Sequence, residues 1–242
     1  FNKYDFFVAA GGDGTVRSVA KQLIGTDKIL GVLPMGSGNG FAREFGFRPI
    51  IRSLLSDITK AGCLTVDVIE LNDHMCLNVA GVGLDSFVAH SFEKSRTRGF
   101  WLYALMTLKN FAKMKPFLVE IQIENQEPFS EEVFDLTIAN TRQFGYNAFI
   151  APEAKPNDGI IDIVILKPFP KILAPLIIYR LFRRTIKDSR YVKYLKTGES
   201  FIIRTKEKRY HIDGDPFEME GEINVRIRRN ALTVLKTKRN KF

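Results

Sequence analysis

The sequence predicts an α/β domain followed by a β-rich sandwich domain. In residues 1–62, short apolar runs alternate with patterns of helical period, as in the βα units of a parallel sheet. From Cys63 onward the apolar period changes from 3.6 to 2, and many short runs of this kind follow. We therefore place the second domain at residues 63–242, with its last strand a candidate to return to the first domain.

Two glycine-rich turns organise the first domain. An apolar strand over residues 4–10 leads into the turn at residues 11–14, and a helix follows over about residues 15–23. A second apolar strand over residues 29–33 leads into the turn at residues 36–40. Because a single helix separates the two strands, both turns are expected at the carboxyl edge of one parallel sheet, where ligands bind.

Turns of this composition suit a phosphate group. Glycine permits positive φ and lets a ligand approach the backbone closely. The free N–H groups at a helix start, with the positive end of the helix dipole, favour an anion. Ordinary tight βα turns are the alternative interpretation, and neither turn matches the Walker A loop or the dinucleotide-binding fingerprint.

The motifs themselves resemble a known family. Gly11-Gly12-Asp13-Gly14-Thr15 and Pro34-x-Gly36-Ser37-Gly38-Asn39-x-Phe41-Ala42-Arg43 resemble the catalytic domain of the diacylglycerol kinase and sphingosine kinase superfamily, which includes the bacterial soluble lipid kinases. The first motif also occurs in NAD kinases, whereas the second favours lipid kinases. The resemblance covers most of the chain and implies a further βαβ unit ahead of residue 1, so we expect the first domain to be N-terminally incomplete.

The resemblance implies ATP as the phosphate donor, with Mg²⁺ as the accompanying metal ion. The backbone of both turns would hold the ATP phosphates. The implied cofactor-binding residues are Gly11, Gly12, Asp13, Gly14, Thr15, Val16, Arg17, Gly36, Ser37, Gly38 and Asn39. One departure is Asn39-Gly40, because bacterial diacylglycerol kinases usually carry Asn-Asp there; the pattern in this chain is closer to sphingosine and ceramide kinases.

Charge and composition restrict the partners. The net charge of +9 indicates an anionic partner, such as a nucleotide, an acidic membrane surface or nucleic acid, although a solvated basic face explains any single cluster equally well. Two cysteines, Cys63 and Cys76, cannot form a disulfide scaffold and lack metal-ligand spacing, which is typical of a cytoplasmic protein. No apolar run reaches the ~18 residues of a membrane span. We expect a cytoplasmic protein, peripheral to the inner membrane face.

The second domain is predicted to be a β-sandwich that is interrupted by two helical segments, which we call the helical excursions. Short strands are expected over residues 64–71, 74–79, 117–124, 134–140, 160–166, 200–205, 209–212, 223–228 and 231–236. The helical excursions occupy residues 85–114 and 168–187. The second excursion combines apolar and basic residues, so it either lies on an anionic bilayer or covers its own sheet, and internal packing is favoured.

In the first excursion, the superfamily resemblance assigns three residues. A Gly-x-Asp segment that ends here in Asp85 precedes a helix with basic residues. The resemblance implies that Asp85 contacts the lipid head group and that Arg96 and Arg98 contact nucleotide phosphates, although the spacing from Asp85 to the first arginine differs. A helix N-cap for Asp85 and a solvated basic loop are the alternatives.

An Asp-Gly pair at Asp158 is the candidate metal site. In bacterial members of the superfamily a matching segment holds a structural Mg²⁺, which would here use Asp158 with the backbone near Lys155 and Ile160. The spacing alone favours a plain turn, because Asp-Gly is a preferred turn dipeptide.

A second Asp-Gly pair supplies the candidate catalytic carboxylates. The segment from His211 to Pro216 resembles the family's Asp-Gly-Glu motif, with Asp213 in the Asp position and Asp215 in the Glu position. The acceptor hydroxyl needs a carboxylate within hydrogen-bond reach. Asp215 is favoured as the base or Mg²⁺ partner, with Asp13 essential in either scheme and Asp213 the remaining candidate.

The predicted function is transfer of the ATP γ-phosphate to the hydroxyl of diacylglycerol or a sphingoid base in the cleft between the domains. The expected partner is a lipid substrate at a membrane surface; a homodimer is compatible with the sequence, and nucleic acid is not expected. A non-catalytic nucleotide- or lipid-binding module is the first alternative. NAD phosphorylation is the second, and it rests on the first motif alone.

Overall fold

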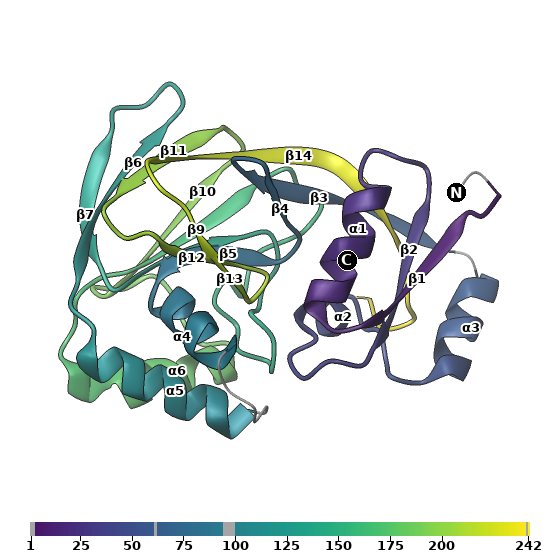
Figure 1. The fold of residues 1–242 in the computed structure, drawn as a ribbon, viewed down its shortest axis with the longest axis horizontal. Coiled ribbons are helices and arrows are strands. Elements are labelled where there is room, and N and C mark those ends of the chain that lie inside the picture. Colours follow the sequence, from purple (N-terminus) through teal and green to yellow (C-terminus); the bar gives the residue numbers. More distant parts are fainter. Residues whose placement is uncertain (1–2, 61, 94–99, 241) are drawn as a thin grey trace.

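The structure is a computed structural model that describes residues 3–60, 62–93, 100–240 and 242. The chain forms two lobes joined by long strands (Figure 1). The smaller lobe contains the N-terminal α/β elements, and the larger lobe is a β-sandwich with helices packed along one side.

The smaller lobe is built on two parallel strands. β1 (Phe6–Gly11) and β2 (Ile29–Pro34) pair along their whole lengths, and α1 (Asp13–Leu23) connects them. The apolar residues of α1 recur at helical spacing and bury one face of the helix against the sheet. The lobe is completed by α2 (Gly40–Glu44) and α3 (Ile51–Lys60). Because β1 and β2 are adjacent and parallel, both glycine-rich turns lie at the same sheet edge, as the sequence predicts.

Two long strands continue from this lobe into the sandwich. β14 (Glu222–Leu235) pairs antiparallel with β3 (Cys63–Leu71) on both sides of a β-bulge. Near its end, Thr233 and Val234 also pair in parallel with β2. One sheet therefore runs from the smaller lobe into the larger one, and its order is β1, β2, β14, β11, β6, β7.

The remaining strands form the sandwich. The first sheet ends with β11 (Phe201–Thr205), β6 (Phe117–Ile123) and β7 (Phe129–Val133). The second sheet has the order β10, β9, β8, β5, β12, β13, with bounds Val192–Thr197, Ile161–Leu166, Asp135–Ala139, Val79–Gly83, Arg209–Ile212 and Asp215–Glu218. Apolar side chains from both sheets, among them Ile121, Phe201, Leu136 and Ile163, are buried in one core between them.

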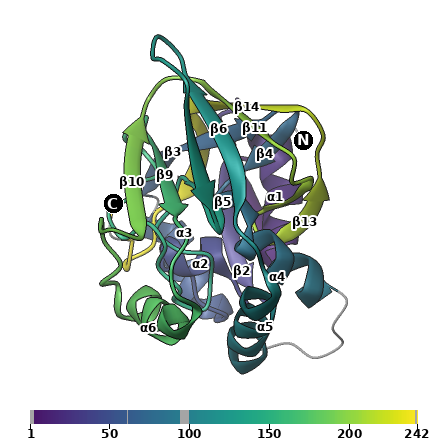
Figure 2. The same ribbon diagram turned by 90° about the vertical axis from the view of Figure 1, so that its left-hand side faces the viewer.

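Helices cover the outer face of the second sheet. α4 (Leu84–Glu93), α5 (Phe100–Lys113) and α6 (Ala174–Arg183) lie beneath it in two perpendicular views, and a 3₁₀ turn (Lys171–Leu173) precedes α6 (Figures 1 and 2). A buried cluster of aromatic rings, which includes Phe111, Phe134 and Phe169, holds α5 and the segment before α6 against the sheet. No described helix is long and apolar enough to cross a membrane.

Three strand expectations need correction. The run over residues 74–79 is not one hairpin strand, because β4 (His74–Cys76) pairs with β3 while Val79 already begins a strand of the other sheet. The runs over 223–228 and 231–236 are one strand, β14, which a bulge between Arg228 and Leu232 interrupts. β7, β10 and β13 were not expected, since their half-exposed sequences FSEEV, VKYLKT and DPFE lack a clean apolar alternation.

Candidate active site

A cavity of about 630 Å³ lies where the two lobes meet. Its walls come from the two glycine-rich turns, the start of α4, the loop at residues 144–146 and the turn between β12 and β13. Four carboxylates reach this cavity: Asp13, Asp85, Asp213 and Asp215. The structure therefore brings together residues that the sequence predicted from four separate segments.

Asp13 fixes the second glycine-rich turn on the first. Its Oδ2 accepts a hydrogen bond from Gly40 N at 3.0 Å, and its Oδ1 accepts one from Phe41 N at 3.1 Å. These are the first N–H groups of α2, so the Asp13 carboxylate caps that helix from another element. Burial raises the pKa of Asp13, and the two N–H donors oppose that rise. Both oxygens are engaged, which suits a positioning role.

The second turn is closed tightly around its glycines. Asn39 has φ of 49°, and its side chain both accepts from Gly36 N at 2.9 Å and donates to Gly36 O at 2.6 Å. A Cβ on Gly36 would lie 2.5 Å from the Cα of Gly12, so the two turns touch through their backbones. A Cβ on Gly40 would lie 2.9 Å from the carbonyl oxygen of Phe144. The departure at Gly40 therefore has a steric reason in this chain, because the loop after β8 occupies the space of a side chain.

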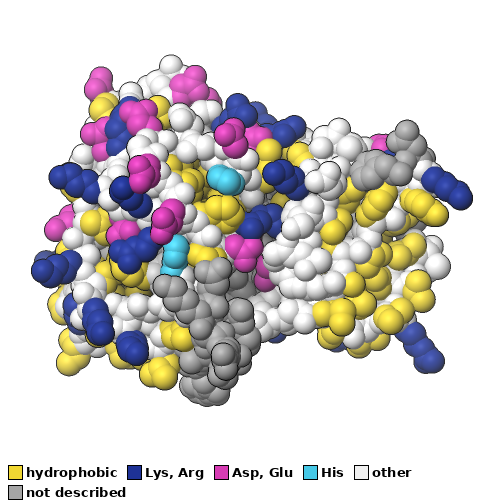
Figure 3. Space-filling view, viewed as in Figure 1, with side chains coloured by type: hydrophobic (Ala, Val, Ile, Leu, Met, Phe, Trp, Pro, Cys, Tyr) yellow, Lys and Arg dark blue, Asp and Glu magenta, His cyan; other side chains and the backbone are white. Residues whose placement is uncertain are grey.

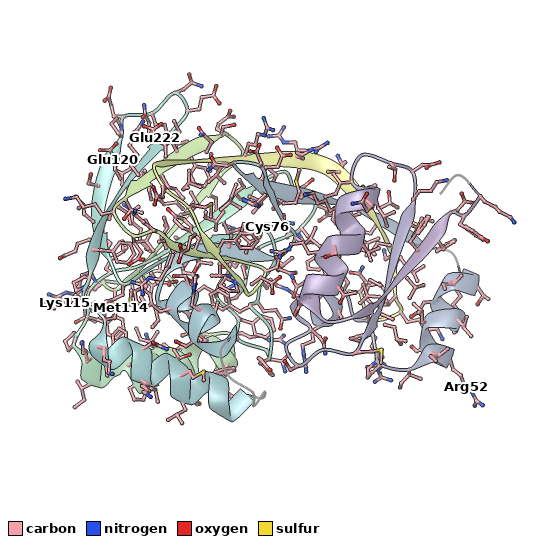
Figure 4. All side chains as sticks on the ribbon, viewed as in Figure 1. Arg52, Cys76, Met114, Lys115, Glu120 and Glu222 are labelled. Atoms are coloured by element: carbon pink, nitrogen blue, oxygen red, sulfur yellow. The ribbon has the colours of Figure 1, made fainter. Side chains whose placement is uncertain are left out.

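Asp213 acts as a second clamp, within the larger lobe. Its φ is 53°, and its oxygens accept from the backbone N–H groups of Leu77, at 3.0 Å, and Asn78, at 2.7 Å. The Cys76 thiol also contacts it, and Figure 4 labels Cys76 near the junction of the lobes. Burial raises the pKa of Asp213. Asp213 thus holds the β12–β13 turn onto the segment between β4 and β5.

Asp215 is the most accessible of the predicted catalytic carboxylates, with 44% of its side chain exposed. Its Oδ2 accepts from Arg17 Nη2 at 2.5 Å, and Arg17 Nη1 donates to the carbonyl oxygen of Ile212 at 2.8 Å. Among the described residues, Oδ1 of Asp215 has no hydrogen-bond partner. Arg17 therefore ties α1 to the β12–β13 turn and leaves one oxygen of Asp215 available to a ligand.

Two predicted residues of the first turn, Gly12 and Val16, contribute no side chain to the cavity. Val16 is 2% exposed and packs in the core of the smaller lobe, so its side chain does not reach the cavity. Gly12 precedes α1 in an extended conformation, and no described side chain caps the helix. The first N–H groups of α1 are thus open toward the cavity, which is the arrangement that an anion requires.

Asp85 belongs to a buried network that the sequence did not indicate. His211 Nδ1 accepts from Gly214 N at 3.3 Å, so the ring proton is on Nε2, which donates to Asp85 Oδ2 at 2.8 Å. Asp135 Oδ1 accepts from Asp85 N at 2.9 Å, while burial and the nearby Asp85 charge raise the pKa of Asp135 well above its usual range. His211 is 126 residues from Asp85 in the chain, and its only sequence signal was its place in the Asp-Gly-Asp motif.

An apolar pocket adjoins the polar cavity. The two share Asp85 and Phe144 as lining residues. The rest of the apolar pocket is lined by residues of α4, α5, α6, the second sheet and the loops after β8 and α6, which are Leu84, Val88, Thr107, Asp135, Ala148, Ile150, Val164, Leu166, Ile177, Ile178, Leu181, Phe182, Ile186 and Val192. The apolar pocket has a volume of only about 60 Å³, so a hydrocarbon chain would have to move its lining side chains apart in order to enter.

The remaining predicted residues lie elsewhere. The Oδ1 of Asp158 accepts a hydrogen bond from Ile160 N at 3.1 Å, which is the contact expected if this segment is a plain turn. Both Asp158 and Lys155 are exposed. Among the described residues, no cluster of three or more His, Cys, Asp or Glu side chains forms a metal site. The metal assignment of Asp158, Lys155 and Ile160 stays a prediction. Arg96 and Arg98 lie outside the described residues.

The residues of the cavity fit a magnesium nucleotide. The backbone N–H groups of α1 and the touching glycines form a cradle that phosphates can approach. The carboxylates give the cavity an excess of negative charge, so a polyphosphate needs an accompanying cation. Mg²⁺ is usually held by one or two carboxylates together with phosphate oxygens and water. Asp215 is placed to be such a ligand.

Comparison with known proteins agrees with this geometry. Residues 1–71 match the model of the diacylglycerol kinase catalytic domain, and residues 78–236 match the YegS C-terminal NAD kinase beta sandwich-like domain. Together these matches cover most of the chain. The chain therefore belongs to the diacylglycerol kinase and YegS superfamily, a family of lipid kinases.

Individual relatives support the same assignment. A diacylglycerol kinase of Mycobacterium tuberculosis is 33% identical over 171 residues, which are 66% of this chain and 54% of that protein. A diacylglycerol kinase of Bacillus subtilis is 26% identical over 218 residues, 88% of this chain and 72% of that protein. The chain thus spans about half the length of the mycobacterial relative.

Solved structures share the fold. The crystal structure of a diacylglycerol kinase from Bacillus anthracis has a TM-score of 0.76 at 21% identity, covering 98% of this chain and 78% of the other. An NAD kinase from Archaeoglobus fulgidus in complex with ATP has a TM-score of 0.58 at 12% identity, covering 98% and 80%. The predicted fold class, with its nucleotide-binding domain and β-sandwich, is confirmed.

Proposed function

We propose that the protein is an ATP- and Mg²⁺-dependent lipid kinase that phosphorylates the hydroxyl of a lipid alcohol, such as diacylglycerol or a sphingoid base, in the cavity between the lobes. The observation that carries this proposal is the junction of the two pockets at Asp85. A cradle for phosphates lies on one side of it, and an apolar pocket for a chain lies on the other.

The chain's own residues divide the work of phosphoryl transfer, which requires mainly positioning and charge neutralisation. Asp13 and Asp213 hold the turns that form the cavity floor through hydrogen bonds to backbone N–H groups. Bound Mg²⁺ supplies neutralisation of phosphate charge. Asp215 is the carboxylate available to accept the acceptor's proton or to ligate the metal, and Arg17 holds its other oxygen.

Asp85 and His211 are placed to orient the acceptor. Asp85 is 8% exposed and stands at the boundary of both pockets. The Nε2–H of His211 fixes one of its oxygens. In the proposed function, this pair positions the polar head of the lipid while the chain occupies the apolar pocket.

The test is transfer of labelled phosphate from ATP, with Mg²⁺, to a panel of diacylglycerol, monoacylglycerol, sphingosine and NAD. The full-length protein is compared with its Asp215→Asn variant and with Glu218→Gln, an exposed carboxylate on the same strand. We expect a lipid product whose rate falls about 100-fold or more in Asp215→Asn and is unchanged in Glu218→Gln.

Other outcomes would redirect the proposal. ATP binding by calorimetry without phosphorylation of any acceptor supports the non-catalytic binding module. Labelled NADP as the product supports the NAD kinase alternative. Full lipid kinase activity in Asp215→Asn removes the role given to that carboxylate.

A further inference from the structure

Asp135 is a buried carboxyl that the phosphoryl transfer described above does not use. It begins β8, 4% of it is exposed, and it lines the apolar pocket but not the polar cavity. Burial of a carboxylate away from water is costly unless a charge or hydrogen bonds compensate for it. The partners of Asp135 therefore show what the group does.

Asp135 joins the start of α4 to the second sheet. Its Oδ1 accepts from Asp85 N at 2.9 Å, and its Oδ2 accepts from the hydroxyl of Thr137 at 2.9 Å. The Thr137 hydroxyl also lies 3.5 Å from Oδ2 of Asp85, so one buried hydroxyl contacts both carboxyl groups. Asp135 therefore holds the backbone of Asp85, and the two carboxyl groups lie next to each other around Thr137.

The carboxylate of Asp85 has little room to move. A Cβ on Gly81 would overlap its Oδ2, so the carboxylate lies directly against the backbone of β5. Ser86 N donates to its Oδ1 at 2.5 Å, and His211 Nε2 donates to its Oδ2 at 2.8 Å. A change in the charge of Asp135 would therefore act on a carboxylate that cannot move away from it without losing these contacts.

The basic groups around the pair do not balance two negative charges. In the part of the chain that the structure describes, His211 is the one basic side chain that contacts either Asp85 or Asp135. The imidazole is neutral in this arrangement, because its Nδ1 accepts from Gly214 N and its proton is on Nε2.

The other surroundings add no compensating charge. On the pocket side, the lining contains no titratable residue besides Asp85 and Asp135. The titratable residues that line the cavity side are Asp13, Tyr146, His211, Asp213 and Asp215. Acidic side chains are visible at this junction of the lobes in the space-filling view (Figure 3), and Arg17 is already paired with Asp215. A second negative charge beside Asp85 would thus face further carboxylates.

Two buried carboxyl groups beside a neutral histidine are most stable with one proton between them, because each charge opposes the ionisation of the other. Burial and the nearby Asp85 charge raise the pKa of Asp135, which places that proton on Asp135. The pair then carries a single negative charge. That charge is on Asp85, the member that reaches the polar cavity.

We propose that Asp135 is a positioning residue for the acceptor: it holds one proton beside Asp85, and so fixes the place and the single charge of the carboxylate that orients the acceptor's head. The orientation of the acceptor rests on the lipid kinase function proposed above. The shared proton does not depend on that function, because contacts within the chain carry it.

The first experiment detects the proton directly. Infrared spectra of the full-length protein in H₂O and D₂O, at about pH 8, record the carbonyl band of protonated carboxyl groups. The variant is Asp135→Asn, and the matched control is Asp162→Asn, a buried carboxyl on the neighbouring strand β9. Because the pKa of Asp162 is about 6, its carboxyl is ionised at this pH and contributes no such band.

We expect a band in the wild type that Asp135→Asn abolishes and Asp162→Asn leaves in place. A band that Asp135→Asn does not change would overturn the shared proton. Circular dichroism melting verifies that each variant is folded.

The second experiment measures the effect on the acceptor. Transfer of phosphate from ATP to short-chain diacylglycerol or sphingosine, whichever the wild type phosphorylates, is compared in Asp135→Asn and in Asp135→Leu, which replaces the carboxyl by methyl groups. We expect kcat/KM for the acceptor to fall about 10- to 100-fold in Asp135→Leu, with the KM for ATP unchanged, because Asp135 contacts Asp85 and not the phosphate cradle. Asp135→Asn keeps an acceptor for Asp85 N and should recover most of this loss.

The pH profile separates positioning from a purely structural role. In the wild type the pair loses its last proton at high pH, and the second charge then repels Asp85, so kcat/KM for the acceptor should fall on the alkaline side. Asp135→Asn has no such proton to lose, so this fall should shift to higher pH or disappear, whereas Asp162→Asn should keep the wild-type profile.

Two results would contradict the positioning role: identical pH profiles in the wild type and Asp135→Asn, or a KM for ATP that rises in Asp135→Leu as much as the KM for the acceptor. If the wild type phosphorylates no acceptor, the proposed function fails, and the infrared result still decides where the proton is held.

Discussion

The polar cavity and the apolar pocket meet at Asp85 and Phe144, yet they are constructed differently. The cavity is made of short turns whose shapes are fixed by hydrogen bonds from carboxylates to backbone N–H groups, as at Asp13 and Asp213. The pocket is lined mainly by apolar side chains, and apart from the shared Asp85 its one carboxylate is Asp135, which also accepts from a backbone N–H. Removal of one residue should therefore disrupt the cavity, whereas the pocket should respond mainly to changes of volume.

The largest expected effect is at Asp13. Asp13→Ala removes both acceptors that cap α2, so the second glycine-rich turn loses its position over the first. We expect activity to fall about 100-fold or more, since a displacement of one ångström in a catalytic site has that consequence. The free energy of unfolding should also fall, by about 1–2 kcal/mol.

The measurements are kinase activity and urea denaturation. The matched control is Asp27→Ala in the same lobe, where 84% of the side chain is exposed and its only ion pair is with Lys28 among the described residues. An Asp13→Ala variant as active as Asp27→Ala would show that the turn keeps its shape without the cap.

A smaller effect is expected in the apolar pocket. Ile178→Trp adds volume to the pocket wall without touching any polar group of the cavity. We expect kcat/KM for a long-chain acceptor to fall about tenfold or more, while the KM for ATP and the rate with a short-chain acceptor stay unchanged. Steady-state kinetics with acceptors of increasing chain length measures this, with Leu118→Trp as the surface control. Equal inhibition for all chain lengths would place the chain elsewhere.

The smallest effect on activity is expected at a buried carboxylate outside both sites. Asp162 on β9 has no backbone N–H donor among the described residues, and its partner is Lys196 at 3.5 Å. Burial raises the pKa of Asp162 to about 6. This pKa is higher than the pKa of Asp162 in the unfolded chain, so the folded state favours the protonated carboxyl. The free energy of unfolding therefore decreases as the pH rises from about 4 to 6 and Asp162 ionises.

Asp162→Asn should therefore stabilise the protein at neutral pH, by on the order of 2 kcal/mol, with little gain at pH 4. Thermal unfolding at several pH values, with the exposed Glu199→Gln as control, measures this difference. Destabilisation at neutral pH would mean that the pair with Lys196 outweighs burial. The contrast with Asp13 tests whether backbone N–H donors are what make the cavity carboxylates stabilising.

The difference between the polar cavity and the apolar pocket also explains what could be predicted from the sequence. The two glycine-rich turns were recognisable because glycine and Asp13 occur at fixed offsets after apolar strands, and local spacing determines their shape. Asp215 was recognisable from the neighbouring Asp-Gly dipeptide. The structure places all of these segments around one cavity, which is more than local spacing could establish.

Other features depend on contacts that are distant in the chain. The pairing of His211 with Asp85 arises because β12 and β5 are neighbours in the second sheet, and nothing in either segment reveals that neighbour. The apolar pocket is assembled from unremarkable side chains of several elements. The steric reason for Gly40 lies in the carbonyl of Phe144, which is remote in sequence. β10 was missed because its lysines and tyrosine mask the alternation of a strand.

The continuous strand β14 limits how the two lobes can move. Because the same strand pairs with β3 on both sides of the bulge and with β2 at its end, a hinge between the lobes would have to break this pairing or bend the strand. The bulge at residues 228–232 is the natural flexing point, and Asp67 locks it by accepting from Asn230 N and Gly159 N, each at 2.7 Å. The shared sheet therefore holds the two lobes in a fixed relative orientation. Any movement during a reaction cycle should occur in the loops and helices around the cavity.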